Sequence, residues 1–200
     1  MEFIDGIADL EALYGVPQET STAKVAAQLT PEYRRWIEAS RFCVLTTVGP
    51  EGTDASPRGD DNPVVRIQDG KTLLLPDWRG NNRIDSLRNI VRDPRVSLMF
   101  MVPGSNNVIR VNGRAKLTAD EALIDSFARR AGRPRTVAVI EIGEVYFQCA
   151  RAIVRSRLWG DHAHHDLPSP GDMLAALTDG RVGGESYDRE WPERAANSMW

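Results

Sequence analysis

Short apolar runs that end in turn-forming residues are the feature that most limits how this chain can fold. Runs of this length, rich in β-branched residues and bounded by Gly, Pro, Asp or Asn, are typical of strands rather than long helices. The turns VGPEGTD and IQDGKT contain the glycines that tight hairpins need, which favours antiparallel neighbours. The six runs begin at Phe42, Asn62, Lys71, Arg95, Asn107 and Thr136, and the last is long enough that we expect a break near Gly143.

Helix signals are fewer than strand signals. Thr30 followed by Pro31 predicts a helix start, because proline at the first helical position loses no hydrogen bond. Thr118 opens a capping-box pattern for a helix that should end at Gly132. A further helix should begin near Asn82, after an apolar strand.

The chain is expected to form one barrel domain with an extension at each end. Six or seven antiparallel strands with few helices predict a mainly β fold with flanking helices, closed into a small barrel because closure removes exposed strand edges. We place a helical arm at residues 1–29, the barrel domain at 30–160 and a C-terminal extension at 161–200. The extension contains one expected helix at GDMLAAL, and its last twenty residues are polar enough for a mobile or partner-wrapping tail.

Composition lowers the expectation of several classes of partner. The 200 residues are 42% hydrophobic, which is enough for one core, and the formal charge of −3 comes without any long block of Lys or Arg that could track nucleic acid. The acidic N-terminus lacks the features of a secretory signal, and no apolar run is long enough to cross a membrane. We therefore expect a cytoplasmic protein without nucleic-acid or membrane partners. Cys43 and Cys149 lie in apolar runs, where reduced and buried thiols without a disulfide are expected.

The stretch TLLLPDWRGNNRIDSL has the residues of an anion site. A strand ends at Pro76, the following loop carries Arg79 and Arg83, and Asn81 or Asn82 is placed to cap the next helix. A helix N-terminus offers free N–H groups and a partial positive charge, and guanidinium groups add bidentate contacts, so this geometry suits a phosphate monoester. The alternative is an ordinary strand-to-helix turn with solvated arginines.

The segment GTDASPRGD, between two strands, is a second candidate. It places Ser56, Pro57, Arg58 and Gly59 where backbone groups could contact a planar ligand, and Arg58 could bring positive charge to an electron-rich ring. The alternative is a polar hairpin.

Two further clusters have a functional and a plain interpretation. His162, His164 and His165 with Asp161 or Asp166 could be imagined as metal ligands, but they are adjacent in a loop without a second cluster, so we predict no metal site. The basic cluster, Arg129, Arg130, Arg133 and Arg135, is expected either to stabilise a helix C-terminus or to bind an anionic substrate or a cofactor phosphate. Nucleophile-elbow, Walker and zinc motifs are missing from the sequence, which disfavours hydrolases and nucleotidases.

Four segments in order resemble one known family. FCVLTTVGPEGTDASPRGD, LLLPDWRGNNRIDSLRNI, VIRVNGRAKL and CARAIVRSRLW are similar to segments of the pyridoxamine-phosphate-oxidase-like, FMN-binding split-barrel flavoproteins, and closer to their uncharacterised FMN-dependent branch than to the true oxidases. The resemblance covers about residues 30–160. It implies a six-stranded antiparallel split β-barrel that forms a homodimer, with one FMN at each of two sites between the subunits.

The resemblance also implies which positions bind the cofactor. Arg83 in the phosphate loop is the first candidate, and the family's polar position on the VIRVNG strand falls at Val108 or Ile109, where Asn107 would have to replace it. Arg157 and Trp159 resemble late contributions to the pocket, from the same or the partner chain. The implied cofactor-binding positions are Ser56, Pro57, Arg58, Gly59, Pro76, Asp77, Trp78, Arg79, Asn81, Asn82, Arg83, Asn107, Arg157 and Trp159.

The leading functional hypothesis is an FMN-dependent oxidoreductase with a small-molecule substrate. The flavin would accept a hydride from a reduced donor and pass electrons to a small organic acceptor or to oxygen, so no catalytic side chain is identified. The segment LWGDHAHHDLPSPGDML does not reproduce the Arg- and His-bearing C-terminal segment of the true oxidases, which argues against pyridoxine phosphate as substrate. The competing hypotheses are a non-catalytic FMN carrier or redox sensor, and a split barrel that uses a deazaflavin or haem.

Overall fold

Antiparallel strands of one sheet make up most of the molecule. The computed structural model describes residues 1–129, 132–160 and 166–198, and within them the sheet has seven strands in the order β2-β1-β5-β6-β7-β4-β3. The strands are β1 (Phe42–Gly49), β2 (Gly52–Gly59), β3 (Arg66–Ile67), β4 (Thr72–Asp77), β5 (Arg95–Met101), β6 (Val108–Thr118) and β7 (Thr136–Gln148).

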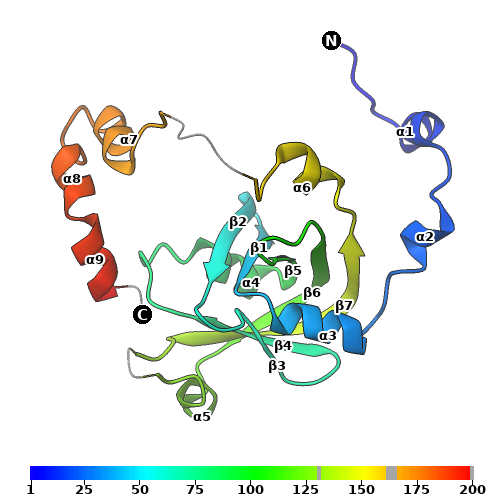
Figure 1. Cartoon of the computed structure of the whole chain (residues 1–200), viewed down its shortest axis with the longest axis horizontal. Coiled ribbons are helices and arrows are strands. Elements are labelled where there is room, and N and C mark those ends of the chain that lie inside the picture. The colour runs from blue at the N-terminus through cyan, green and yellow to red at the C-terminus, as the bar shows by residue number, and fades with distance from the viewer. Residues whose placement is uncertain (130–131, 161–165, 199–200) are drawn as a thin grey trace.

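The sheet curls until β2, at one end of the strand order, lies beside β4, the last strand but one. β2 is the first strand of the order and β4 the sixth, yet the Arg58 Nη1 atom on β2 lies 2.6 Å from Asp77 Oδ1 on β4. In the described sheet β2 is hydrogen-bonded only to β1, so β2 and β4 are joined by side chains and not by backbone hydrogen bonds. We call the junction between β2 and β4 the seam. The mainly β split-barrel prediction is therefore confirmed, with seven strands where six were expected (Figure 1).

The strand that the apolar pattern did not indicate is β2. None of the residues of β2 is buried, so β2 contributes no side chain to the core. Pro57 lies within β2, opposite Val44 of β1. A proline has no N–H for a ladder and is tolerated in a strand at a sheet edge. A strand of this kind shows little of the apolar alternation on which sequence prediction relies.

The core fills the barrel with side chains from alternate strand positions. Phe100, Leu98, Val111 and Ile140 are fully buried and belong to one cluster with Ile37 from α3 (Pro31–Glu38). The predicted start of α3 is confirmed, since the Thr30 side chain accepts a hydrogen bond from the Tyr33 N–H at 3.3 Å.

Two helices begin later than predicted. α4 (Asp85–Arg92) begins at Asp85 and not near Asn82, because Asn82 and Ile84 have φ values of 62° and 54°, outside the helical region. α5 (Glu121–Asp125) is capped by Asp120, whose side chain accepts from the Leu123 N–H, while the predicted cap Thr118 belongs to β6. The predicted helix end at Gly132 is also wrong, since α5 ends at Asp125.

β7 does not break at Gly143 as predicted. It continues to Gln148, and the register shifts where Asn112 faces Glu144 but Gly113 faces Ile142, which leaves Gly143 as an extra residue. Such a bulge bends a strand without ending it. A Cβ atom on Gly113 would overlap the carbonyl oxygen of Glu141, so only glycine fits there.

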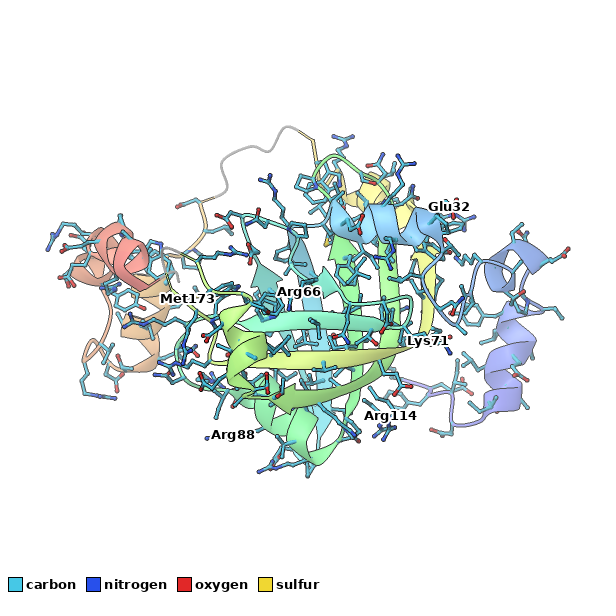
Figure 2. All side chains as sticks on the ribbon, turned by 90° about the horizontal axis from the view of Figure 1, so that it is seen from below. Glu32, Arg66, Lys71, Arg88, Arg114 and Met173 are labelled. Atoms are coloured by element: carbon cyan, nitrogen blue, oxygen red, sulfur yellow. The ribbon has the colours of Figure 1, made fainter. Side chains whose placement is uncertain are left out.

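Helical segments extend from both ends of the barrel, on opposite sides of it in Figures 1 and 2. The predicted helix at GDMLAAL is confirmed, and the last twenty residues, expected as a polar tail, contain two helices. The N-terminal arm has α1 (Ile7–Tyr14) and α2 (Glu19–Thr22); α6 (Arg151–Ser156) follows β7, and the C-terminal extension has α7 (Pro170–Leu177), α8 (Glu185–Arg189) and α9 (Trp191–Ser198). Among the described residues, no helix combines the length and apolar character needed to cross a bilayer.

Both cysteines are free, but only one is buried. Cys43 is fully buried on β1, and burial raises the pKa of its thiol to about 12 against the opposing effect of Arg58. Cys149 is exposed, so the expectation of a buried thiol is correct for Cys43 and wrong for Cys149.

The bulge gives a test of the fold. Replacing Gly113 by Ala should lower the free energy of unfolding by about 3 kcal/mol, because the methyl group meets backbone that cannot move independently. Gly70→Ala is the matched control, since a Cβ there meets nothing within 4 Å. Urea unfolding of both variants measures the effect, and equal midpoints would show that the close approach at Gly113 is not a constraint.

Candidate functional site

A cavity of about 1020 Å³ opens at the seam. It lies between β2, the end of β4, the loop that follows β4 and the start of α4, and Arg135 and Thr136 line it from the start of β7. We call it the seam cavity. The structure thus brings two segments that are separate in sequence to one place, since the cavity is lined by the predicted positions Ser56, Pro57, Arg58, Gly59, Pro76, Asp77, Trp78, Arg79, Asn81, Asn82 and Arg83.

Two residues that line this cavity each have a buried polar atom without a hydrogen-bond partner among the described residues. Arg58 is held through its Nη1 atom by Asp77, but its Nε atom has no partner, and the same holds for the Thr136 hydroxyl. Both residues line the seam cavity. Leaving a buried donor unpaired costs about 1–3 kcal/mol, so such atoms are rare in folded proteins without a role. Both atoms are covered by protein in this conformation, so a polar ligand in the cavity would satisfy them only by turning the two side chains toward it.

A buried carboxylate holds one wall of the cavity in place. Asp60 is 2% exposed and accepts hydrogen bonds from the Arg129 guanidinium at 2.8 and 3.0 Å and from Trp78 Nε1 at 3.0 Å. The guanidinium also lies over the Trp78 ring at 4.8 Å from its centroid. Burial raises the pKa of the Asp60 carboxyl, but hydrogen bonds from Arg129 and the Asn62 N–H outweigh it and leave the pKa below its usual value.

The loop between β4 and α4 is organised by its own asparagines. Asn81 Oδ1 accepts from the Arg83 N–H at 3.1 Å, and Asn82 Oδ1 accepts from Arg135 Nη1 at 2.8 Å. Neither asparagine caps α4, which corrects the prediction; the N-cap residue is Ile84, without a side-chain cap. The asparagines instead shape the loop and tie it to the start of β7.

The charges of the seam cavity are mixed. Arg83 is 77% exposed and paired with Asp85 at 2.9 Å, so part of its charge is already neutralised. Arg135 has an amide oxygen as its hydrogen-bond acceptor and no carboxylate partner among the described residues. The charged residues that line the cavity are Asp54, Arg58, Asp60, Asp61, Asp77, Arg79, Arg83, Asp85 and Arg135. Anion recognition here would depend on individual guanidinium groups and not on net charge.

The basic cluster separates in the structure. Arg135 lines the cavity and Arg129 supports it through Asp60, while Arg133 pairs with Glu121 and Asp125 on α5. Arg130, also part of this cluster, lies outside the described residues. Arg135 was thus indicated by the anion-binding alternative, whereas Thr136 was missed because nothing in the sequence distinguishes the first residue of a strand.

Three of the predicted cofactor-binding positions lie outside the seam cavity of their own chain. Trp159 Nε1 donates to the Ser105 carbonyl oxygen at 2.7 Å, and the Asn107 N–H donates to the Ser105 hydroxyl at 3.4 Å, beside the turn between β5 and β6. Arg157 lies just after α6 with φ of 51°. None of the three lines the seam cavity of its own chain, and their cofactor role stays a prediction.

The residues His162, His164 and His165, with Asp161, lie outside the described residues. Within the described residues, no three His, Cys, Asp or Glu side chains gather as they would around a metal ion.

The Asp60 contacts give a pH-dependent prediction. Asp60→Asn should lower the stability at pH 7 by about 1–3 kcal/mol, because a charged acceptor of buried hydrogen bonds is lost. Since the pKa of Asp60 is lowered on folding, its contribution is present above the unfolded pKa of about 3.9 and is lost as the pH falls through the folded value.

The gap between wild type and Asp60→Asn should therefore be largest near neutral pH and shrink below about pH 4. Asp61→Asn is the matched control, since Asp61 contacts the same Arg129 but is 68% exposed, and it should change stability by less than about 1 kcal/mol. Urea unfolding across this pH range measures both variants. A gap that widens on acidification would contradict the assigned direction.

Comparisons with known proteins identify the family. A family model described as pyridoxamine 5'-phosphate oxidase matches residues 29–149, more than half of the chain. A comparison with curated protein sequences gives no match.

Among solved structures, HupZ of Group A Streptococcus is 20% identical, with 58% of this chain and 91% of that chain covered and a TM-score of 0.49. A FAD-binding protein of Mesorhizobium loti is 18% identical, with 62% and 94% covered and a TM-score of 0.42. The FAD binding protein of Mycobacterium smegmatis is 13% identical, with 62% and 97% covered and a TM-score of 0.43. These likenesses are distant, and the assignment depends on the family model. By that match, the chain belongs to the pyridoxamine 5'-phosphate oxidase family.

Proposed function

We propose that the seam cavity binds FMN and that the protein is an FMN-dependent oxidoreductase acting on a small-molecule substrate. The observation that carries the proposal is that β2, the loop after β4 and the start of β7 meet around one cavity, and that two of its lining residues, Arg58 and Thr136, each have a buried polar atom without a partner in the described structure. Family membership adds support, since the resemblance described above associates this family with FMN. A bound flavin would supply the electron-transfer chemistry, and the protein would supply binding, orientation and charge.

The size and the lining of the cavity support a ligand with a flat polar ring and a phosphate. Its volume of about 1020 Å³ is at the upper end of small-molecule pockets, which are roughly 300–1,000 Å³. The edge of β2 around Pro57 and Arg58 would face the ring. Arg83 and Arg135, on either side of the asparagine loop, would face the phosphate.

The chain's own residues would set the position and charge of the ring. Asp77 holds Arg58 at one edge of the cavity, so the guanidinium is fixed but partly neutralised. Asp60 and Arg129 hold Trp78, an aromatic wall suited to a planar ring. We also propose a homodimer in which Asn107, Arg157 and Trp159 of the partner subunit complete the cavity.

Thr136 provides the most direct test of the ligand. Thr136→Val should weaken FMN binding about tenfold, because the hydroxyl that would contact the ligand is replaced by a methyl group of similar size. The same substitution should leave the stability of the ligand-free protein unchanged or raise it by up to about 1 kcal/mol, since it removes an unpaired buried hydroxyl.

Isothermal titration with FMN and thermal unfolding measure the two effects separately. Thr72→Val is the control, because Thr72 lies in the same β4 and β7 ladder at the opposite end from the cavity. Equal FMN affinity in the Thr136 variant and wild type would remove this hydroxyl from the site. No FMN binding by the wild-type protein would overturn the proposed function.

Arg83 tests the phosphate end of the site. Arg83→Ala should weaken FMN binding about tenfold or more, whereas Arg88→Ala should not, although both side chains pair with Asp85. Of these two arginines, only Arg83 lines the cavity. Absorption spectra during titration with FMN measure both affinities, and equal losses in the two variants would indicate a general charge effect.

Saturable oxidation of a nicotinamide cofactor would separate the enzyme from a flavin carrier or sensor, which shows no turnover.

A further inference from the structure

The N-terminal segment, residues 1–16, is apolar and acidic, and none of its residues is buried. None of the residues of α1 is buried, and the side chains of Phe3, Ile7, Leu13 and Tyr14 are between 70% and 82% exposed. The segment has four carboxylates, and the chain contains no Lys or Arg before Lys24. Apolar side chains gathered in one exposed segment mark a surface that is covered by a partner.

A groove with complementary character lies on the barrel, away from the seam. It is formed by the turn between β3 and β4 together with β6 and β7, and its volume is about 1020 Å³. We call it the basic groove. Its half-buried lining includes Leu117, Val139 and Pro94, so part of the lining is apolar.

Three exposed cations line this groove: Lys71, Arg114 and Lys116. No ion pair within 4 Å joins any of them to a carboxylate in the part of the chain that the structure describes. Two carboxylates, Asp69 and Glu141, also line the groove, so the cations exceed the carboxylates by one. Figure 2 shows Lys71 and Arg114 on the side of the barrel from which the arm projects.

We infer that the basic groove receives the N-terminal segment of a second copy of this chain. The exposed apolar side chains of the segment match the apolar lining, and its four carboxylates match the three unpaired cations. Opposite charges around an apolar centre are the arrangement of specific protein interfaces.

The course of the chain favours a second copy over the chain's own segment. Ala26 pairs with Val145, Gln28 lines the groove, and the Leu29 N–H donates to the Gly70 carbonyl oxygen at 2.8 Å. The chain therefore approaches its own groove only after Ala26, and the preceding residues lead away from it. In Figures 1 and 2, α1 and α2 project outward from the barrel.

The scarcity of lysine allows a clean test by carbodiimide, which joins a carboxylate to an amine. The chain has three lysines, and two of them, Lys71 and Lys116, line the groove. One full-length version has the substitutions Lys71→Arg and Lys116→Arg, so its groove keeps its charge but has no amine. A second version has Glu2→Gln, Asp5→Asn, Asp9→Asn and Glu11→Gln, so its segment has no carboxylate side chain.

Neither version alone can form a cross-link between segment and groove, but the two co-expressed versions can form it between chains. We expect mass spectrometry to find segment peptides joined to Lys71 or Lys116 in the wild type and in the co-expressed pair. Cross-links in the wild type but not in the pair would show that the segment returns to its own groove. Either that result or no such cross-link in either sample would overturn the inference.

The contribution of the groove's positive charge to binding can be tested with the same cross-linking assay. Arg114→Gln in the wild-type chain should lower the yield of these cross-links about threefold or more, because a groove cation is lost while both lysines remain. Arg181→Gln, an exposed arginine of the C-terminal extension, should leave the yield unchanged. Equal yields in both variants would show that charge does not hold the segment in the groove.

Discussion

The ion pair between Arg58 and Asp77 is the contact on which the arrangement of this molecule depends. It joins the first strand of the sheet to the sixth, so it closes the barrel at a place where no backbone ladder does. Both side chains are 20% exposed, at the boundary between core and solvent. Closure by side chains leaves room beside the pair, and the seam cavity is that room.

Most of the strands could be predicted because their burial follows the alternation of apolar residues. β1, β4 and β5 pack into the core and were visible in the sequence within a residue or two. β2 was not visible as an apolar run because one side of it forms the seam cavity and its other residues are exposed. The start of α4 was misplaced because left-handed residues such as Ile84 cannot be recognised from their type, and the start of α5 because Asp120, two residues after Thr118, is the cap.

The candidate site was predictable in its segments and not in its contacts. The loop with Arg79 and Arg83 and the strand with Arg58 carry local signals, and a resemblance to one family linked them. The wall formed by Asp60, Trp78 and Arg129 joins residues up to 69 positions apart, so only the fold shows it. Thr136 became a candidate for a similar reason, because its significance is the lack of a partner in the folded chain.

The prolines on either side of the seam affect how β2 and β4 can be joined. Pro57 lies in β2 and Pro76 in β4, and both line the cavity. Proline has no N–H to donate, so a backbone ladder that included these two positions would lack hydrogen bonds there. The same absence of donors protects β2, an exposed edge, from pairing with a strand of another molecule. The two prolines are therefore consistent with a seam held by the Arg58–Asp77 ion pair and not by backbone hydrogen bonds.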